Sequence, residues 1–215
     1  GTPITDFLVL KKLEQFKQDK NELNKRLGLD NQIMRILGNK ARRDPKRIVF
    51  AEADNIKILK AAQIIFDEGI GFPILLGKEK KIRAIAEENS IDIDELPIID
   101  PQSDEQEEKR KAYGDLFFKK RHRRGVNQYE SQKAMRDRNH FGCMMVDAGE
   151  ADAMISGLTK NYADTIRPAI QIIGCEEGVQ KIAGMYLLLT KRGPLFMADT
   201  TVNFNPTAEE LADIT

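Results

Sequence analysis

The stretch MMVDAGEADAMISGLTKNYADTIRPAIQ, residues 144–171, decides the fold that we expect for this chain. A short apolar segment at residues 153–155 is followed by a loop of small and polar residues at 156–162 and by a helical pattern that begins near Ala163. This order predicts a strand, a loop and a helix. At such a junction the first turn of the helix points N–H groups at the loop, and the helix dipole favours negative charge there.

The loop before this helix is therefore a candidate anion site, and phosphate is the anion most often bound at a helix N-terminus. Arg167 falls within the first turn of the predicted helix, where a guanidinium group can add a bidentate contact. The alternative is a plain crossover between strand and helix, in which the Ser and Gly residues serve only the turn. These residues alone leave both interpretations open.

Three short β-rich runs precede this stretch, at residues 47–51, 72–77 and 96–99, and a helical pattern follows each of them. The proline in the third run favours an edge position, because proline cannot donate to a strand ladder. Ser103 and Gln106 predict a capping box before the next helix, and Asn127 with Glu130 predicts another helix start. The alternation of strands and helices predicts an α/β fold with a parallel, doubly wound sheet and helices on both faces.

The pattern divides the chain into three parts: a helical linker or arm at residues 1–43, a first α/β domain at 44–176, and the start of a second α/β domain at 177–215. The last part contains two adjacent apolar runs, and Thr207 and Glu210 then predict a capping box. A helix cut after about two turns is marginal alone. We therefore expect a truncated second domain; the alternative is a short C-terminal helix that docks on the sheet.

Composition gives no global sign of a nucleic-acid partner, because Lys plus Arg and Asp plus Glu both number 34. The basic run at residues 119–124 can contact phosphates, or it can be the solvated end of a helix, and no aromatic platform is interleaved with it. No apolar run approaches the ~18 residues of a membrane span, and we see no signal peptide. We expect a cytoplasmic protein without a nucleic-acid or membrane partner.

Few residues carry a recognisable catalytic or metal-binding pattern. Cys143 and Cys175 lie in no CxxC pair and near no histidine at ligand spacing, so we expect two buried free thiols and no zinc site. The sequence contains no GxSxG elbow, no HExxH helix and no GxGxxG after the first strand. Asp199, at the end of a predicted strand, is a possible polar ligand.

The longest candidate motif is ADTIRPA at residues 163–169. Matching residues occur before and after it, as RIVFAE at 47–52, a basic helix end at 121–125, GEADA at 149–153, SG at 156–157, QII at 171–173 and a motif over 199–212. Together these residues resemble the signature region of phosphate acetyl/butyryl transferases, from about residue 40 to the end of the sequence. Asn161 and Tyr162 depart from the pattern, since active transferases usually carry two threonines there. That departure and the helical arm resemble the C-terminal transferase-like domain of large NADP-dependent malic enzymes.

The resemblance implies two α/β domains with a cleft between them, and dimers are usual in the family. The transferases move an acetyl group between phosphate and the thiol of coenzyme A without a metal. By resemblance, Arg167 contacts a phosphoryl group or coenzyme A, Ser156, Thr159 and Asp164 line the same loop, and Arg121 reaches the cleft. The family's other Ser–Arg pair and its catalytic Asp lie further along the chain, so we expect no catalytic residue, metal or resident cofactor in this sequence.

For function, the resemblance implies a domain that binds acetyl-CoA, coenzyme A or a related acyl-CoA or phosphate ligand. It would serve regulation and oligomerisation of an NADP-dependent malic enzyme, which uses NADP and a divalent metal to convert malate to pyruvate. The expected partners are the malic-enzyme domain of the same chain and further copies in a homo-oligomer, with the domain itself inactive. The alternatives are an active phosphate acetyltransferase and an assembly module with a vestigial cleft.

Overall fold

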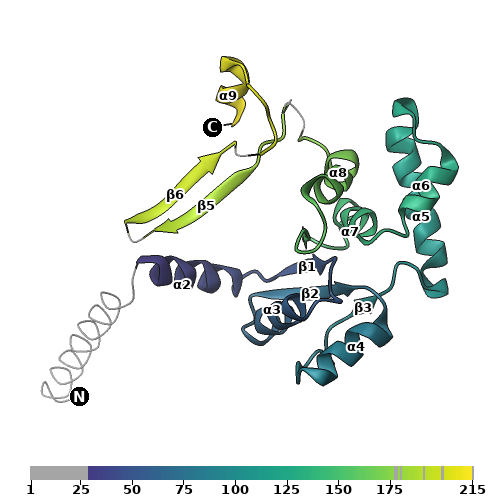
Figure 1. Cartoon of the computed structure of the whole chain (residues 1–215), viewed down its shortest axis with the longest axis horizontal. Coiled ribbons are helices and arrows are strands. Elements are labelled where there is room, and N and C mark those ends of the chain that lie inside the picture. The colour runs from purple at the N-terminus through teal and green to yellow at the C-terminus, as the bar shows by residue number, and fades with distance from the viewer. Residues whose placement is uncertain (1–28, 177–178, 180, 191, 200, 215) are drawn as a thin grey trace, which may run out of the picture. The chain divides into compact units, whose positions relative to one another are not determined.

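The computed structural model describes residues 29–176, 179, 181–190, 192–199 and 201–214. The part of the expected helical arm at residues 1–28 lies outside these ranges. The chain divides into two compact units, one of residues 41–182 and one of residues 1–40 together with 183–215, whose elements are labelled in Figure 1. Each unit is described by itself, and the domain boundaries expected at residues 44 and 177 stay a prediction.

The larger unit is built on a four-stranded parallel sheet with strand order β3-β2-β1-β4. Its elements in chain order are β1 (Lys46–Phe50), α3 (Ile56–Asp67), β2 (Gly71–Leu76), α4 (Glu79–Glu88), β3 (Ile98–Ile99), η1 (Asp104–Gln106), α5 (Glu107–Arg121), η2 (His122–Arg124), α6 (Gln128–Ala134), α7 (Arg138–Asp147), β4 (Ala153–Ile155) and α8 (Tyr162–Ile172). The proline-containing run forms edge strand β3, as predicted. The parallel sheet with helices on both faces is confirmed.

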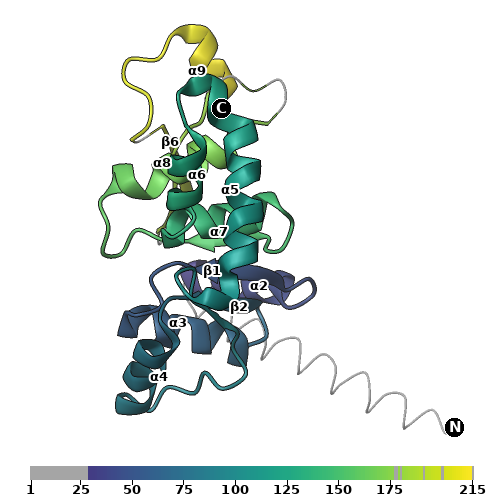
Figure 2. The same ribbon diagram turned by 90° about the vertical axis from the view of Figure 1, so that its right-hand side faces the viewer.

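Two hydrophobic cores lie on opposite faces of the sheet, because successive side chains of a strand point to opposite sides. Val49 and Leu76 pack into one core, with apolar side chains of α5, α7 and α8. Phe50 and Leu75 pack into the other, with side chains of α3 and α4. Figure 2 shows α3 and α4 on one side of β1 and β2, and α5 to α8 on the other. The near-continuous apolar runs in the sequence follow from this double burial.

The strand order reverses direction at β1. The chain first moves outward from β1 to β2 and β3, and then returns to place β4 on the other side of β1. In the register, Val49 of β1 lies opposite Ile74 of β2 and Met154 of β4. In open α/β sheets, ligands bind outside the carboxyl ends of the strands at such a reversal. The segments after Phe50 and Ile155 are therefore the first place to look for a site.

Two details differ from the sequence prediction. The hydroxyl of Ser103 makes no capping hydrogen bond and instead donates to the Asp100 carbonyl at 3.0 Å, so the predicted Ser103 capping box is wrong. A short 3₁₀ turn precedes α5 and begins the helix in its place. The Asn127 capping box is confirmed, since its side chain accepts from the Glu130 amide and the Glu130 carboxylate accepts from the Asn127 amide.

The two cysteines also differ from each other. Cys143 is fully buried, and burial, with Asp137 nearby, raises the pKa of its thiol to about 12. Cys175 is exposed, so the expectation that both thiols are buried is wrong for this one. It lies three residues after the end of α8, where the chain leaves the packed helix for a loop. The thiol of Cys143 is a packing group rather than a nucleophile, because a raised pKa keeps it protonated.

The second unit contains α2 (Leu29–Ala41), the antiparallel strands β5 (Met185–Thr190) and β6 (Gly193–Ala198), and α9 (Ala208–Ile214). The two adjacent strands and the Thr207–Glu210 capping box are confirmed. The carboxylate of Asp199 accepts from the amides of Gly184 and Asn203, at 2.9 and 2.6 Å, and holds the segment after β6 in place. Among the described residues, no helix is long and apolar enough to cross a membrane.

The double core predicts unequal effects for two residues of β2. Leu75 is fully buried and Phe72 is 51% exposed. Leu75→Ala leaves a cavity, so it should lower the free energy of unfolding by about 2–5 kcal/mol, while Phe72→Ala should cost clearly less. Urea denaturation measures both changes, and equal losses would contradict the placement of β2 between the two cores.

Candidate functional site

A hollow of about 470 Å³ lies beside the start of α8, on the side of the N-terminus of α7. Its volume falls within the ~300–1,000 Å³ that small-molecule sites usually have. The lining residues are Asp137, His140, Thr159, Lys160, Asn161, Asp164, Arg167 and Pro168. We call this hollow the α8 pocket. Three residues predicted from the sequence, Thr159, Asp164 and Arg167, line it together, whereas Ser156 and Arg121 do not.

The loop between β4 and α8 is folded around an acidic side chain that the sequence prediction missed. The carboxylate of Glu52, just after β1, accepts hydrogen bonds from the amides of Gly157, Leu158, Thr159 and Lys160 at 2.8, 2.7, 2.8 and 3.2 Å. The Thr159 hydroxyl donates to the same carboxylate. We expected a ligand anion at the amides of the first turn of the helix; the amides of the loop before that helix bind an anion of the chain itself.

Glu52 is charged although it is only 4% exposed. Burial acts to raise its pKa, but the hydrogen bonds from Thr159, Leu158 and Gly157 outweigh burial, so the pKa lies below its usual value. A buried carboxylate is tolerated where several donors replace its lost water. The loop conformation and the charge of Glu52 therefore depend on each other.

A buried amide connects this loop to two helices. Asn139 of α7 is fully buried, and its Oδ1 accepts from the Ser156 hydroxyl at 2.8 Å. Pro168 lies inside α8 and has no N–H to donate to the carbonyl one turn back, at Asp164. The Asn139 Nδ2 donates to that carbonyl at 3.4 Å. Ser156 is thus a structural contact at the end of β4, and α8 tolerates its proline because Asn139 supplies the missing donor.

The start of α8 is closed by its own cap. Asn161 accepts from the Asp164 amide through its side-chain oxygen at 2.9 Å, and its Nδ2 donates to the Asp164 carboxylate at 2.6 Å. An N-cap of this kind satisfies one of the four donors that a helix start leaves without a partner. The same Asp164 carboxylate lies 4.0 Å from the Arg167 guanidinium.

Cationic and anionic groups of the α8 pocket are paired with each other. Lys160 Nζ lies 2.6 Å from one oxygen of Asp137, and His140 Nδ1 lies 2.9 Å from the other. Burial acts to raise the pKa of Asp137, but the contacts from His140 and Lys160 outweigh it and hold the pKa well below its usual range. The Arg167 side chain is 62% exposed. The Arg167 and Lys160 side chains can therefore bind an incoming anion. Arg167 would leave Asp164 to do so, and Lys160 would leave Asp137.

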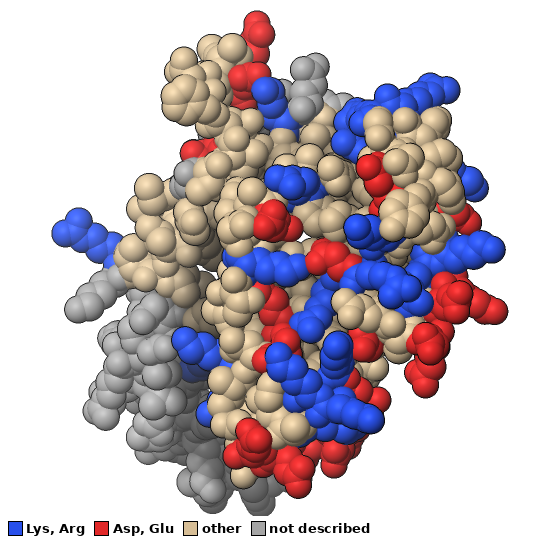
Figure 3. Space-filling model, turned by 45° about the vertical axis from the view of Figure 1, so that its right-hand side comes forward, with Lys and Arg blue, Asp and Glu red and all other residues tan. Residues whose placement is uncertain are grey.

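The basic run at residues 119–124 ends α5 and continues through η2. Lys120 Nζ contacts the Asp147 carboxylate at 2.5 Å and the Ile172 carbonyl at 3.1 Å, so it ties α5 to the ends of α7 and α8. The Nε of Arg121 is buried without a hydrogen-bond partner. Figure 3 shows basic side chains interspersed with acidic ones among the described residues of one face. This part of the run is structural, and the mixed charge does not favour a nucleic-acid surface.

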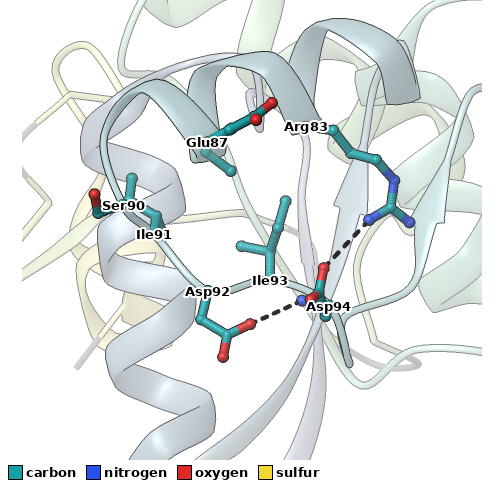
Figure 4. A pocket seen from close by; sticks show the side chains of 8 residues that line it. Arg83, Glu87, Ser90, Ile91, Asp92, Ile93 and Asp94 are labelled. Atoms are coloured by element: carbon teal, nitrogen blue, oxygen red, sulfur yellow. Dashed lines mark hydrogen bonds and ion pairs between the residues drawn. The ribbon is translucent and has the colours of Figure 1, made fainter.

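A second hollow suits an anion less well. This hollow of about 460 Å³, drawn in Figure 4, lies between α4 and the loop that follows it. Its charged lining consists of Arg83, which pairs with Asp94 at 3.7 Å, and of Glu87, Asp92 and Asp94. Three carboxylates beside one guanidinium repel phosphate. In the described ranges, no group of three or more His, Cys, Asp or Glu residues is arranged to hold a metal ion.

Comparisons with known proteins agree with this fold and motif set. A sequence model described as "phosphate acetyl/butaryl transferase" matches residues 32–215. The chain is 36% identical to a phosphate acetyltransferase of Clostridium acetobutylicum over 81% of its length and 53% of that protein. It is 33% identical to an NADP-dependent malic enzyme of Escherichia coli over 99% of its length and 27% of that enzyme. A phosphotransacetylase structure from Staphylococcus aureus superposes with a TM-score of 0.76 at 27% identity, covering 86% of this chain and 55% of that one.

The chain belongs to this transferase family. It spans about half the length of some of the transferases that it matches, and about a quarter of the length of other transferases and of the malic enzymes. Its relatives therefore include free-standing transferases and the transferase-like part of NADP-dependent malic enzymes.

The sequence predicted pocket residues on the loop and on α8, but not those on α7. Asp137 and His140 lie on α7, far from the motif that drew attention, and no spacing rule connects them to Arg167. Lys160 stood within the quoted loop but was not singled out. Glu52 carried a usable signal, because it is an acidic residue directly after a buried parallel strand, where ligands and loop contacts gather.

The depressed pKa of Asp137 predicts a specific acid sensitivity. A carboxyl group whose folded-state pKa is lowered stabilises the fold fully above its unfolded pKa of about 3.9, and this contribution is lost as pH falls toward the folded value. Asp137→Asn should therefore flatten the fall in unfolding free energy between about pH 5 and pH 3. Urea denaturation at several pH values measures this, with the exposed Asp92→Asn as control. Identical pH profiles for wild type and Asp137→Asn would contradict the assignment.

Proposed function

We propose that this chain is the phosphate-acetyltransferase-like domain of an NADP-dependent malic enzyme, and that it binds acetyl-CoA or a related ligand in the α8 pocket. In this role it regulates the activity and supports the oligomeric assembly of a protein whose other domain oxidises malate to pyruvate. That domain supplies the NADP and divalent-metal chemistry. The residues described here bind and orient the ligand and take no part in the redox step.

The observation that carries the malic-enzyme branch is the extent of the alignments. The malic enzymes of Escherichia coli and Rhizobium meliloti align with 99% and 95% of this chain. The transferases of Clostridium acetobutylicum and Bacillus subtilis align with 81% and 78%. The malic enzyme of Salmonella typhimurium and the transferase of Thermoanaerobacterium thermosaccharolyticum do not differ in this respect, at 86% and 85%. Identity does not separate the two branches, since it is 32–36% in these relatives. The longer alignments include the arm before the family match at residue 32, which supports the malic-enzyme context.

The α8 pocket supports binding of an anionic ligand. Lys160 and Arg167 both line it, and each side chain is paired with a carboxylate that shares the pocket. Guanidinium and ammonium groups bind phosphoryl oxygens through charge-assisted hydrogen bonds. Coenzyme A derivatives carry several phosphoryl groups, so exchange of an internal partner for a ligand phosphoryl group is a plausible binding step.

A second candidate function is phosphate acetyltransfer itself. It is favoured by the free-standing transferases among the relatives, which match at 36% and 35% identity. In that case the same cations would stabilise the charge of an acyl phosphate during attack by the coenzyme A thiol. The residues 161–162, Asn and Tyr, differ from the two threonines that the resemblance leads us to expect, which weighs against this function.

The pocket predicts that Arg167→Ala weakens acetyl-CoA binding to the full-length protein by about tenfold or more, because one charge-assisted contact is lost. Isothermal titration calorimetry measures the affinity. Arg83→Ala removes the same charge from the acidic hollow on α4, and it should leave the affinity unchanged. Equal affinities for wild type and Arg167→Ala would contradict the placement of the ligand.

The regulatory role predicts that acetyl-CoA changes malate oxidation by the full-length protein, because allostery requires the ligand to favour one state over another. NADPH formation is followed with and without acetyl-CoA. An unchanged rate and an unchanged affinity for malate would reject regulation. Acetyl-CoA formation from acetyl phosphate and coenzyme A, lost in Arg167→Ala, would favour the transferase alternative.

A further inference from the structure

The contacts of Glu52 have a consequence for ligand binding that the family motifs do not express. Four consecutive backbone amides, at residues 157–160, converge on one carboxylate. Successive N–H groups that point into one concavity form an anion-binding nest, and phosphate-binding loops are built in this way. Here the anion is the side chain of Glu52, which follows β1 and lies 105 positions earlier in the sequence than Gly157.

The nest is held from both sides. Glu52 follows β1, and the Ala51 amide donates to the Ile155 carbonyl of β4 at 3.2 Å, so the strand ends that bear the carboxylate and the loop are fixed to each other. Gly157 has φ of +107°, a conformation that a side chain would disfavour. Without the carboxylate, the amides of the loop would lose their partners.

The loop residues that Glu52 holds are also residues of the α8 pocket. Thr159 and Lys160 line the pocket and donate their amides to Glu52, and Asn161 follows them directly. Glu52 itself is not among the lining residues. It therefore acts on the pocket through the loop rather than by contact with the ligand.

We propose that Glu52 is a positioning residue: its carboxylate fills the nest that a ligand phosphate would otherwise occupy, and so shapes the loop that presents Thr159, Lys160 and Asn161 to the ligand. This inference rests on the proposed function for its ligand. An anion on that ligand then meets the side chains of Lys160 and Arg167, because the loop amides are already paired. The loop is preformed before binding.

Glu52→Ala tests this inference because it removes the carboxylate from the nest and puts no other polar group in its place. In the full-length protein, hydrogen exchange at the amides of residues 157–160 should speed up by about tenfold or more, as expected when hydrogen bonds to a charged group are lost. Affinity for acetyl-CoA should fall with it. Acetate, a free carboxylate small enough for the vacated space, should slow the exchange again and restore part of the affinity in a saturable way. Chloride at the same ionic strength should do neither.

Glu150→Ala is the matched control. Glu150 is a glutamate that accepts from the Tyr113 hydroxyl at 2.6 Å and contacts Lys109, but it binds no run of amides. Acetate should not rescue that variant. If Glu52→Ala does not fold, Glu52→Gln keeps the side-chain volume while turning an NH₂ group toward the nest, so it should also speed exchange at residues 157–160, without rescue by acetate.

The outcomes separate this inference from the proposed function. Unchanged exchange at residues 157–160 in both Glu52 variants, or faster exchange in Glu52→Ala that acetate does not reverse, would overturn the positioning role. If the wild type binds no acetyl-CoA, the proposed function fails, while faster exchange with rescue by acetate still supports the role of Glu52. If the wild type binds acetyl-CoA but hydrogen exchange at residues 157–160 is unchanged in both Glu52 variants, only the positioning role is wrong.

Discussion

The arrangement of the candidate site depends on one buried carboxylate and the four amides around it. Glu52 accepts from residues 157–160 while it is almost fully buried. A buried charge is stable only where hydrogen-bond donors replace its water. Loop amides that have no partner in a helix or strand likewise need an acceptor. The Glu52 carboxylate and the loop amides satisfy each other's hydrogen-bonding requirement, at the point where the strand order reverses. The loop that lines the α8 pocket is thus fixed to the carboxyl ends of β1 and β4.

Helix α8 and its pocket follow from this anchored loop. Asn161 caps the helix directly after the last amide that Glu52 binds, and Asn139 supplies the donor that Pro168 lacks. The cations of the pocket face internal carboxylates, Asp137 for Lys160 and Asp164 for Arg167. The Arg167–Asp164 pair joins two exposed side chains at 4.0 Å, and such surface pairs contribute little to stability. Exchange of this pair for a ligand contact therefore costs little free energy, which suits a binding site.

Local patterns in the sequence predicted the fold well. Apolar runs gave the strands, the proline gave the edge strand β3, and Asn127 with Glu130 gave a helix start. Ser103 failed as a cap because its hydroxyl found the Asp100 carbonyl, a choice that spacing does not reveal. The family motifs led to Arg167 and Asp164 as site residues. Glu52 stood in the matching run at 47–52 without an assigned role, and Asp137 and His140 stood outside the motifs. Those residues join the site through contacts between distant segments, which local periodicity does not express.

The most direct measurement of the account is a crystal structure of the full-length protein with acetyl-CoA bound. The account predicts a phosphoryl group of the ligand within hydrogen-bond distance of Lys160 or Arg167, with the Glu52 carboxylate still bound to the amides of residues 157–160. A phosphoryl group in the nest with Glu52 displaced, or a ligand bound away from the α8 pocket, would contradict it.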